Sequence, residues 1–212
     1  CAVAALQKAA PHDRALDIVD VGTGPNLIPF MCALPRARSL TAWEYAASNV
    51  AWLKRELAAR EMRPQWRHFW NVTRQTYGDR AGLPENPLAD LARKSRIEQG
   101  SIFELPERRW DAATMFFCAE SITGDRHEFD RACRAFARCV KPGGLLAAAF
   151  LVRSAGYIVA NRDFPVLHLD ASTIEAVFAP DADAIDARSI GLVEREIRSG
   201  YAGFVFLTGR AR

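Results

Sequence analysis

Short apolar runs alternate with amphipathic segments along most of this 212-residue chain. Strands are predicted at 15–22, 39–45, 96–103, 110–118 and 145–152, and the first and last of these have the composition of buried strands. Helices are predicted between them, over 27–34, 46–60 and 126–139. Because strands that alternate with helices favour a mostly parallel sheet with helices on both faces, the sequence predicts an α/β fold.

The last part of the chain completes the predicted sheet. Residues 157–169 are typical of a hairpin over its edge, and 171–178 of a last helix. Strands are predicted at roughly 184–190 and at 203–210. A closing pair of this kind fits a sheet that has one antiparallel strand near its edge.

The segment 61–95 interrupts the alternation. It contains Pro64, Pro84 and Pro87, and it ends in a charged helical turn. We interpret it as a less regular insertion on the sheet and expect a single domain over 1–212, a length that suits one α/β domain.

Charge and cysteine usage exclude several classes of protein. A net charge of +3 without a clustered basic face gives no reason to expect a nucleic-acid partner. The longest apolar run, 145–152, is too short to span a bilayer. An odd, scattered set of five cysteines is typical of reduced thiols, so we expect a cytoplasmic protein. The wealth of alanine and arginine hints at a bacterial source.

The stretch DVGTGPN, residues 20–26, joins the first strand to the first helix. Gly22 and Gly24 can adopt positive φ and allow the backbone to approach a ligand closely. Such a turn lies at the carboxyl end of the sheet, where open α/β folds bind ligands. Glu44 ends the next strand, 22 positions after Gly22, and could accept hydrogen bonds from both ribose hydroxyls.

The position after the turn distinguishes between nucleotide cofactors. A dinucleotide motif G-x-G-x-x-G would have a third glycine at 27, where this chain has Leu27. Pro25 also lacks the backbone N–H that a phosphate would accept. S-adenosylmethionine (SAM), a nucleoside without phosphates, is therefore favoured. An NAD(P)-dependent oxidoreductase is the alternative.

Five segments together resemble a known family: DVGTGPN, WEYAASNVAWLKREL, FFCAESI, KPGGLL and GYIVANRDF. In order and spacing they are similar to the small-molecule methyltransferases that act on nicotinamide, phenylethanolamine, indolethylamine and thioethers. The resemblance covers essentially the whole chain. It implies the Rossmann-like class I methyltransferase fold, a sheet of seven strands of which the last is antiparallel, with helices on both faces.

The resemblance also implies a cofactor site, with S-adenosylhomocysteine (SAH) as the product. Gly22, Gly24 and Asn26 would contact the methionine portion, and Glu44 the ribose. Ser101 and Ile102 would flank the adenine, where family members often have an aspartate in place of the serine. The complete set is Asp20, Gly22, Gly24, Asn26, Glu44, Tyr45, Asn49, Ser101, Ile102, Phe116 and Phe117.

For the methyl acceptor, the resemblance implies contacts from Phe117, Glu120, Ser154 and Tyr157. Glu120 could hold an ammonium group or take a proton from the nucleophile, although a solvated surface carboxylate is the plainer interpretation. His168 is a second candidate base, with a structural histidine as its alternative.

The expected acceptor is a small aromatic or heteroaromatic molecule. Family members that methylate amines have further acids where this chain reads FLVRS (150–154) and SGYAG (199–203), so a neutral acceptor fits better. N-methylation is favoured, with C- and O-methylation open. We expect no metal, and a monomer or homodimer.

The resemblance implies an N-terminal arm of helices that closes over the site, and the roughly 15 residues before the first strand are too few to form it. We therefore expect either a truncated protein or an arm outside this sequence. A non-catalytic SAM-binding partner protein is a further alternative to an enzyme.

Overall fold

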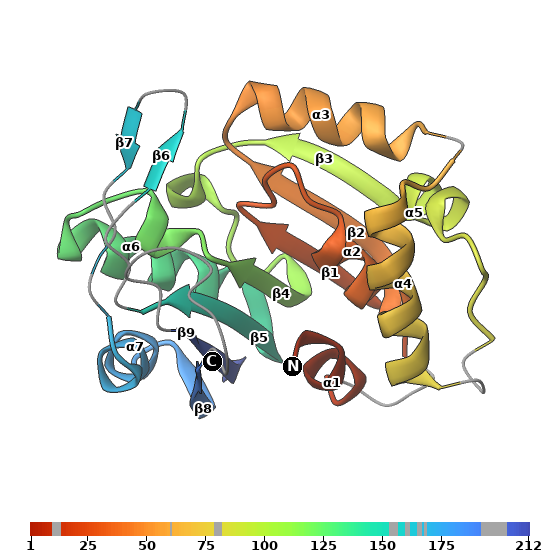
Figure 1. Cartoon of the computed structure of the whole chain (residues 1–212). Coiled ribbons are helices and arrows are strands. Elements are labelled where there is room, and N and C mark those ends of the chain that lie inside the picture. Colours follow the sequence, from red (N-terminus) through yellow and green to blue (C-terminus); the bar gives the residue numbers. More distant parts are fainter. Residues whose placement is uncertain are drawn as a thin grey trace.

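The computed structural model describes residues 1–9, 14–59, 61–78, 82–152, 157–159, 162–164, 167, 169–191 and 203–212. Seven strands form its main sheet: β1 (Leu16–Val21), β2 (Ala37–Glu44), β3 (Ser95–Gln99), β4 (Trp110–Phe116), β5 (Val140–Leu151), β8 (Ala182–Gly191) and β9 (Gly203–Ala211). Their spatial order is β3-β2-β1-β4-β5-β9-β8 (Figure 1).

One strand of this sheet runs against the others. β1 pairs in parallel with β2 and β4, while β2–β3 and β4–β5 are also parallel pairs. β9 pairs antiparallel with both of its neighbours, β5 and β8. The predicted mostly parallel sheet with one antiparallel strand near its edge is confirmed.

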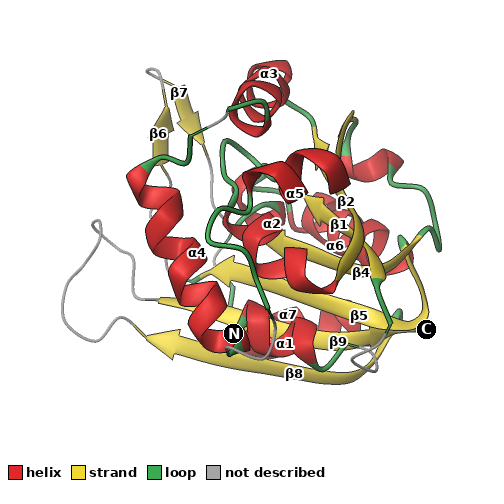
Figure 2. Ribbon diagram, turned by 90° about the vertical axis from the view of Figure 1, so that its right-hand side faces the viewer, coloured by secondary structure: helices red, strands yellow, loops and turns green. Residues whose placement is uncertain are grey.

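Helices cover both faces of the sheet (Figures 1 and 2). On one face lie α6 (Arg126–Arg138) and α7 (Ala171–Phe178). The other face carries α1 (Ala2–Gln7), α2 (Ile28–Ala33), α3 (Ala47–Leu57), α4 (Pro64–Tyr77) and α5 (Leu88–Lys94). No helix in the described part of the chain is long and apolar enough to cross a membrane.

Strand alternation divides the buried side chains between the two faces of the sheet. Ile18 packs with the α1–α5 side, whereas its neighbour Val19 packs with the α6–α7 side. Ala112 and Ala113 of β4 divide in the same way. Successive side chains of a strand point to opposite faces, so a continuous apolar run is what a sheet covered on both sides requires.

The segment 61–95 is more regular than the sequence predicts, because α4 occupies 64–77. The charged helical turn that the sequence predicts at its end is present as α5. Trp66 and Trp70 of α4 are buried in the core on the α2 side, and the Trp66 indole N–H donates to Glu56 Oε1 at 2.6 Å. Pro64 stands at the first position of α4, where the absent N–H is not needed. The proline thus begins this helix and does not interrupt it.

Two strand boundaries also differ from the sequence prediction. The third strand ends at Gln99, four residues early, because Ser101 caps a short 3₁₀ helix, η3 (Ile102–Glu104). The fifth strand begins at Val140, so the KPGG turn is part of it. The predicted hairpin is present as the antiparallel pair β6 (Tyr157–Val159) and β7 (Arg162–Phe164), separate from the main sheet.

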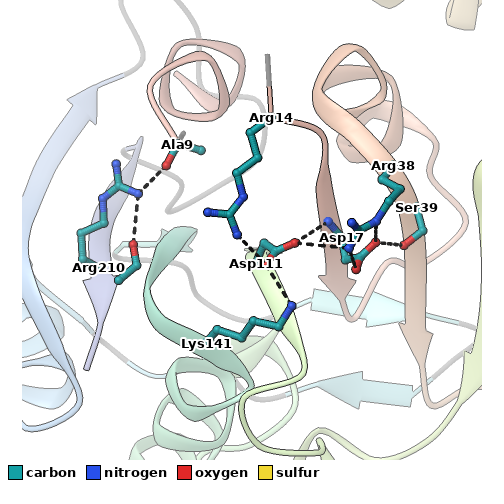
Figure 3. A network of polar contacts seen from close by, with 9 residues as sticks. Ala9, Arg14, Asp17, Arg38, Ser39, Asp111, Lys141 and Arg210 are labelled. Atoms are coloured by element: carbon teal, nitrogen blue, oxygen red, sulfur yellow. Dashed lines mark hydrogen bonds and ion pairs between the residues drawn. The ribbon is translucent and has the colours of Figure 1, made fainter. Parts of the chain in front are cut away.

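A polar network ties together the amino ends of four strands (Figure 3). Asp111 accepts from the backbone N–H of Asp17 at 2.9 Å and from Lys141 Nζ at 3.0 Å. Arg14 donates to the same carboxylate at 3.3 Å, and Arg38 pairs with Asp17. This edge of the sheet lies opposite the carboxyl ends of the parallel strands, where the glycine turn stands.

Candidate functional site

Two cavities lie at the carboxyl ends of β1, β2 and β4, around the glycine turn. The first has a volume of about 790 Å³ and the second about 320 Å³. Gly22 and Phe117 line both, so the cavities adjoin along these two residues. Such a position, beyond the carboxyl ends of parallel strands, is where open α/β sheets bind ligands.

Every residue predicted to contact the cofactor lines one of the two cavities. The first is lined by Gly22, Gly24, Glu44, Tyr45, Asn49, Ser101, Ile102 and Phe117. The second is lined by Asp20, Gly22, Asn26, Phe116 and Phe117. Residues that the sequence separates by up to about 100 positions are thereby brought together.

The two glycines of the turn have different surroundings. Both have positive φ, +67° at Gly22 and +62° at Gly24. A Cβ on Gly22 would lie 2.2 Å from Cys118 Sγ, so the turn packs tightly against the chain after β4. A Cβ on Gly24 would meet nothing within 4 Å and would point into open space. Gly22 thus permits close packing, while Gly24 leaves room in the cavity.

Glu44, at the end of β2, holds the glycine turn through its carboxylate. Oε2 accepts from the Gly24 N–H at 2.8 Å. Oε1 accepts from the Ala46 N–H at 2.8 Å and from Asn49 Nδ2 at 3.3 Å. A carboxylate offers about four acceptor sites, so it keeps capacity for a further donor in the cavity.

Asp20 is a buried acid next to the second cavity. Its Oδ1 accepts from Thr114 Oγ1 at 2.6 Å, while its buried Oδ2 has no hydrogen-bond partner among the described residues. Burial raises the pKa of Asp20 to about 7, although the hydrogen bond from Thr114 opposes the rise. An unpaired buried oxygen of this kind is suited to a cationic or hydrogen-donating ligand.

Phenylalanines form a wall of the second cavity. Phe117 adopts φ +57°, a conformation that is strained for a bulky residue. Its N–H donates to Ala149 O at 2.8 Å, and its ring meets Phe204 edge-on at 5.6 Å. Phe116 stacks on Phe206 with 6.3 Å between ring centroids. Neighbouring contacts therefore hold Phe117 where it borders both cavities.

The far end of the first cavity is built from Trp43 and the start of η3. The Trp43 indole donates to Ser101 O at 2.9 Å. The Ser101 side chain accepts from Phe103 N at 3.3 Å, and the Glu104 side chain accepts from Ser101 N at 3.3 Å. This capping box fixes Ser101 and Ile102 at the cavity.

The residues predicted to contact the acceptor are less completely described. Glu120 is fully buried and lines neither cavity, so its role as an acid or base stays a prediction. Burial raises the pKa of Glu120 to about 7. Tyr157 begins β6, and Ser154 and His168 lie outside the described residues.

Sequence reasoning missed several lining residues, among them Trp43, Cys118, Phe204 and Phe206. Phe204 and Phe206 alternate along β9, so they share one face of that strand. The alternation was visible in the sequence, but the position of β9 beside β5 was not. Within the described ranges, no group of three or more His, Cys, Asp or Glu side chains could hold a metal ion.

The sheet order and the cavities around the glycine turn define a class I SAM-dependent methyltransferase fold. The chain matches the NNMT/PNMT/TEMT family over residues 3–207 and belongs to it. Since this is a family of SAM-dependent methyltransferases, the NAD(P)-dependent alternative is excluded. Leu27, which replaces the third glycine of a dinucleotide motif, is fully buried in the core beside α2.

Individual relatives are distant. Indolethylamine N-methyltransferase of Mus musculus is 22% identical over 204 residues, which cover 91% of this chain and 76% of the relative. Nicotinamide N-methyltransferase of Homo sapiens is 21% identical over 75% of this chain and 62% of its own length. The crystal structure of a SAM-dependent methyltransferase from Methanosarcina mazei superimposes with a TM-score of 0.65, at 14% identity, over 97% of this chain and 96% of that one.

Proposed function

We propose that the two adjoining cavities bind SAM and that the protein transfers its methyl group to a small aromatic or heteroaromatic acceptor. The adenosine portion would lie in the first cavity. The methionine portion would lie against Asp20 and Asn26 of the second cavity, whose phenylalanines would face the acceptor. When bound, SAM supplies a methyl carbon that is already activated by a sulfonium leaving group. The protein's own contribution is then to bind, orient and exclude water.

The residues at the cavities fit such a ligand. Glu44 keeps acceptor capacity for ribose hydroxyls beside the donors that it already binds. The unpartnered Oδ2 of Asp20 is suited to the ammonium group of the methionine portion. The open space above Gly24 admits the ligand close to the backbone. Each of these features would contact a different part of SAM.

The acceptor proposal rests on the phenylalanine wall. Phe116, Phe117, Phe204 and Phe206 line the second cavity and offer ring faces and edges to a flat aromatic molecule. The segments 150–154 and 199–203 have no acidic residue, which supports a neutral acceptor. We favour nitrogen as the methylated atom, because relatives of this chain are named N-methyltransferases. Carbon and oxygen are the alternative acceptor atoms.

The chemistry demands little of the protein beyond geometry. An aromatic nitrogen with a free lone pair needs no base, since nothing must be deprotonated. A phenol or a carbon acid would lose a proton. Of the two candidate bases, Glu120 is fully buried and lines neither cavity, which favours His168 for that role. An in-line arrangement of nucleophile, methyl carbon and sulfur would account for most of the rate.

The observation that supports this function best is that all the predicted cofactor residues meet at the two cavities. Titration calorimetry with SAM and with SAH tests it directly, and absence of binding to both would overturn the proposal. A screen of phenols, indoles, pyridines and amines with SAM then tests catalysis. SAM binding without turnover of any acceptor would instead support a non-catalytic binding protein.

A further inference from the structure

Glu120 occupies an unusual place next to the cofactor cavities. It lies in a 3₁₀ turn, η4 (Ala119–Ser121), directly after β4. Cys118 before it and Ser121 and Ile122 after it line the first cavity, but Glu120 does not. Its side chain points away from the cavity into the protein and has no exposed surface.

The hydrogen bonds of Glu120 join three separate stretches of the chain. Its Oε1 accepts from the backbone N–H of Leu151, the last residue of β5, at 2.9 Å. Its backbone carbonyl accepts from the N–H of Leu167 at 3.4 Å. One residue of η4 therefore contacts both the chain that leaves β5 and the chain that returns toward α7.

We propose that Glu120 is a positioning residue, which fixes the cavity wall on either side of η4 against the end of β5, and that it exchanges no proton with the acceptor. The inference rests on the proposed function only in taking the first cavity as the cofactor site. The acid acts through the turn, because the residues that flank it, Phe117, Cys118, Ser121 and Ile122, line the first cavity.

The environment of Glu120 favours an anchor over a base. A base must reach the proton that it abstracts, yet this carboxyl group lies behind the wall that the cofactor would contact. Its Oε2 has no hydrogen-bond partner among the described residues, and burial raises the pKa of the group. A neutral carboxyl still presents a carbonyl oxygen to Leu151, so the anchor requires no charge.

This distinction can be tested with three substitutions. Glu120→Gln retains a carbonyl oxygen at full length but cannot act as a base. Glu120→Asp retains the acid but falls one methylene short of Leu151. Glu120→Leu removes the acceptor altogether. Glu175→Leu, an exposed glutamate on α7, is the matched control for loss of one carboxylate.

Two measurements are needed, and neither depends on the identity of the acceptor. Calorimetry with SAH reports the cofactor cavity. Hydrogen exchange of peptides that contain Leu151 and Leu167 measures how firmly Glu120 holds these two segments. The rate of trypsin cleavage after Arg153 and Arg162 is a second measure of the same contacts. We expect Glu120→Gln to resemble the wild type within about twofold in SAH affinity, as a net-neutral exchange of hydrogen-bond acceptors allows. In Glu120→Leu and Glu120→Asp the SAH affinity should fall roughly tenfold, and the amide hydrogens of both peptides should exchange faster.

The outcomes separate the hypotheses. Equal losses of SAH affinity in Glu120→Gln and Glu120→Leu would overturn the anchor role. Unchanged amide hydrogen exchange in Glu120→Asp would overturn it as well. If Glu120→Leu does not fold, the contrast between Gln and Asp still decides the question. If the wild type binds no SAH, the proposed function fails, while the exchange data still test the anchor itself.

Discussion

The carboxylate of Glu44 accepts a hydrogen bond from the backbone N–H of Gly24 at 2.8 Å. The end of one strand thereby holds the turn that follows its neighbour. The same carboxylate accepts from Ala46 and Asn49, so it also orders the start of α3. Glu44 thus shapes the cavity as well as lining it.

Replacement of Glu44 by alanine should weaken SAM binding by about 1 to 3 kcal/mol, because charge-assisted hydrogen bonds are lost. Titration calorimetry would measure this change. Glu85→Ala, at an exposed position away from both cavities, should leave the affinity unchanged. Equal SAM affinity in Glu44→Ala and the wild type would remove Glu44 from the cofactor site.

Gly22→Ala should destabilise the fold more than Gly24→Ala does. Both positions have positive φ, so each alanine costs about 1 kcal/mol or more in backbone strain. Only Gly22→Ala adds a clash, with Cys118 Sγ at 2.2 Å from the new Cβ. Urea denaturation of both variants would compare their free energies of unfolding. Equal losses would show that the packing against Cys118 is not rigid.

The stability of the protein should fall as the pH rises from about 4 to about 7. Asp20 has a pKa of about 7 in the folded state and 3.8 as its ordinary value. Across this interval the folded chain retains a proton that the unfolded chain releases, so rising pH favours unfolding. The effect of one such group is at most about 4 kcal/mol, and Glu120 has a pKa shifted in the same direction.

Asp20→Asn should remove part of this pH dependence, because an amide does not titrate. The amide carbonyl oxygen can still accept the hydrogen bond from Thr114. Denaturation midpoints at pH 5 and pH 8 would measure the difference. We expect the variant to gain stability over the wild type at pH 8 and not at pH 5. An unaltered slope would show that Asp20 titrates at its ordinary pKa.

Trp70→Ala should cost about 3 to 5 kcal/mol, the range for truncating a large buried aromatic side chain. Trp70 is fully buried, and its indole donates to Pro84 O at 2.9 Å. Val72→Ala on the exposed face of α4 is the control and should stay within about 0.5 kcal/mol of the wild type. A mild effect of Trp70→Ala on chemical denaturation would mean that α4 is not part of the cooperative core.

The sheet could be predicted from the sequence because its central strands β1, β4 and β5 are buried on both faces, which leaves continuous apolar runs such as 145–152. The glycine turn and Glu44 were likewise visible, since their spacing along the chain reflects adjacent parallel strands. α4 could not be predicted in the same way, because three prolines within 61–95 indicate an irregular segment, whereas Pro64 stands at the first position of the helix. A proline is unfavourable inside a helix but suits its first position, so a proline alone indicates either a break or a helix start.

Other parts of the site depend on long-range geometry. Phe204 and Phe206 reach the second cavity only because β9 lies next to β5. The inward direction of the Glu120 side chain follows from the path of η4 and from a hydrogen bond to Leu151. Neither the strand order near the edge nor the direction of a side chain in a short turn follows from residue spacing.

The network around Asp111 has a consequence for how this protein can vary. It fastens the amino ends of β1, β2, β4 and β5, whereas the cavities open at the carboxyl ends of β1, β2 and β4. The polar network that stabilises the sheet and the cavities that would bind ligands thus lie at opposite ends of the same strands. Substitutions near Phe204 could change the acceptor with little effect on the base of the sheet, and mutants at Asp111 could lose stability without losing selectivity. Such a division leaves the acceptor end free to diversify.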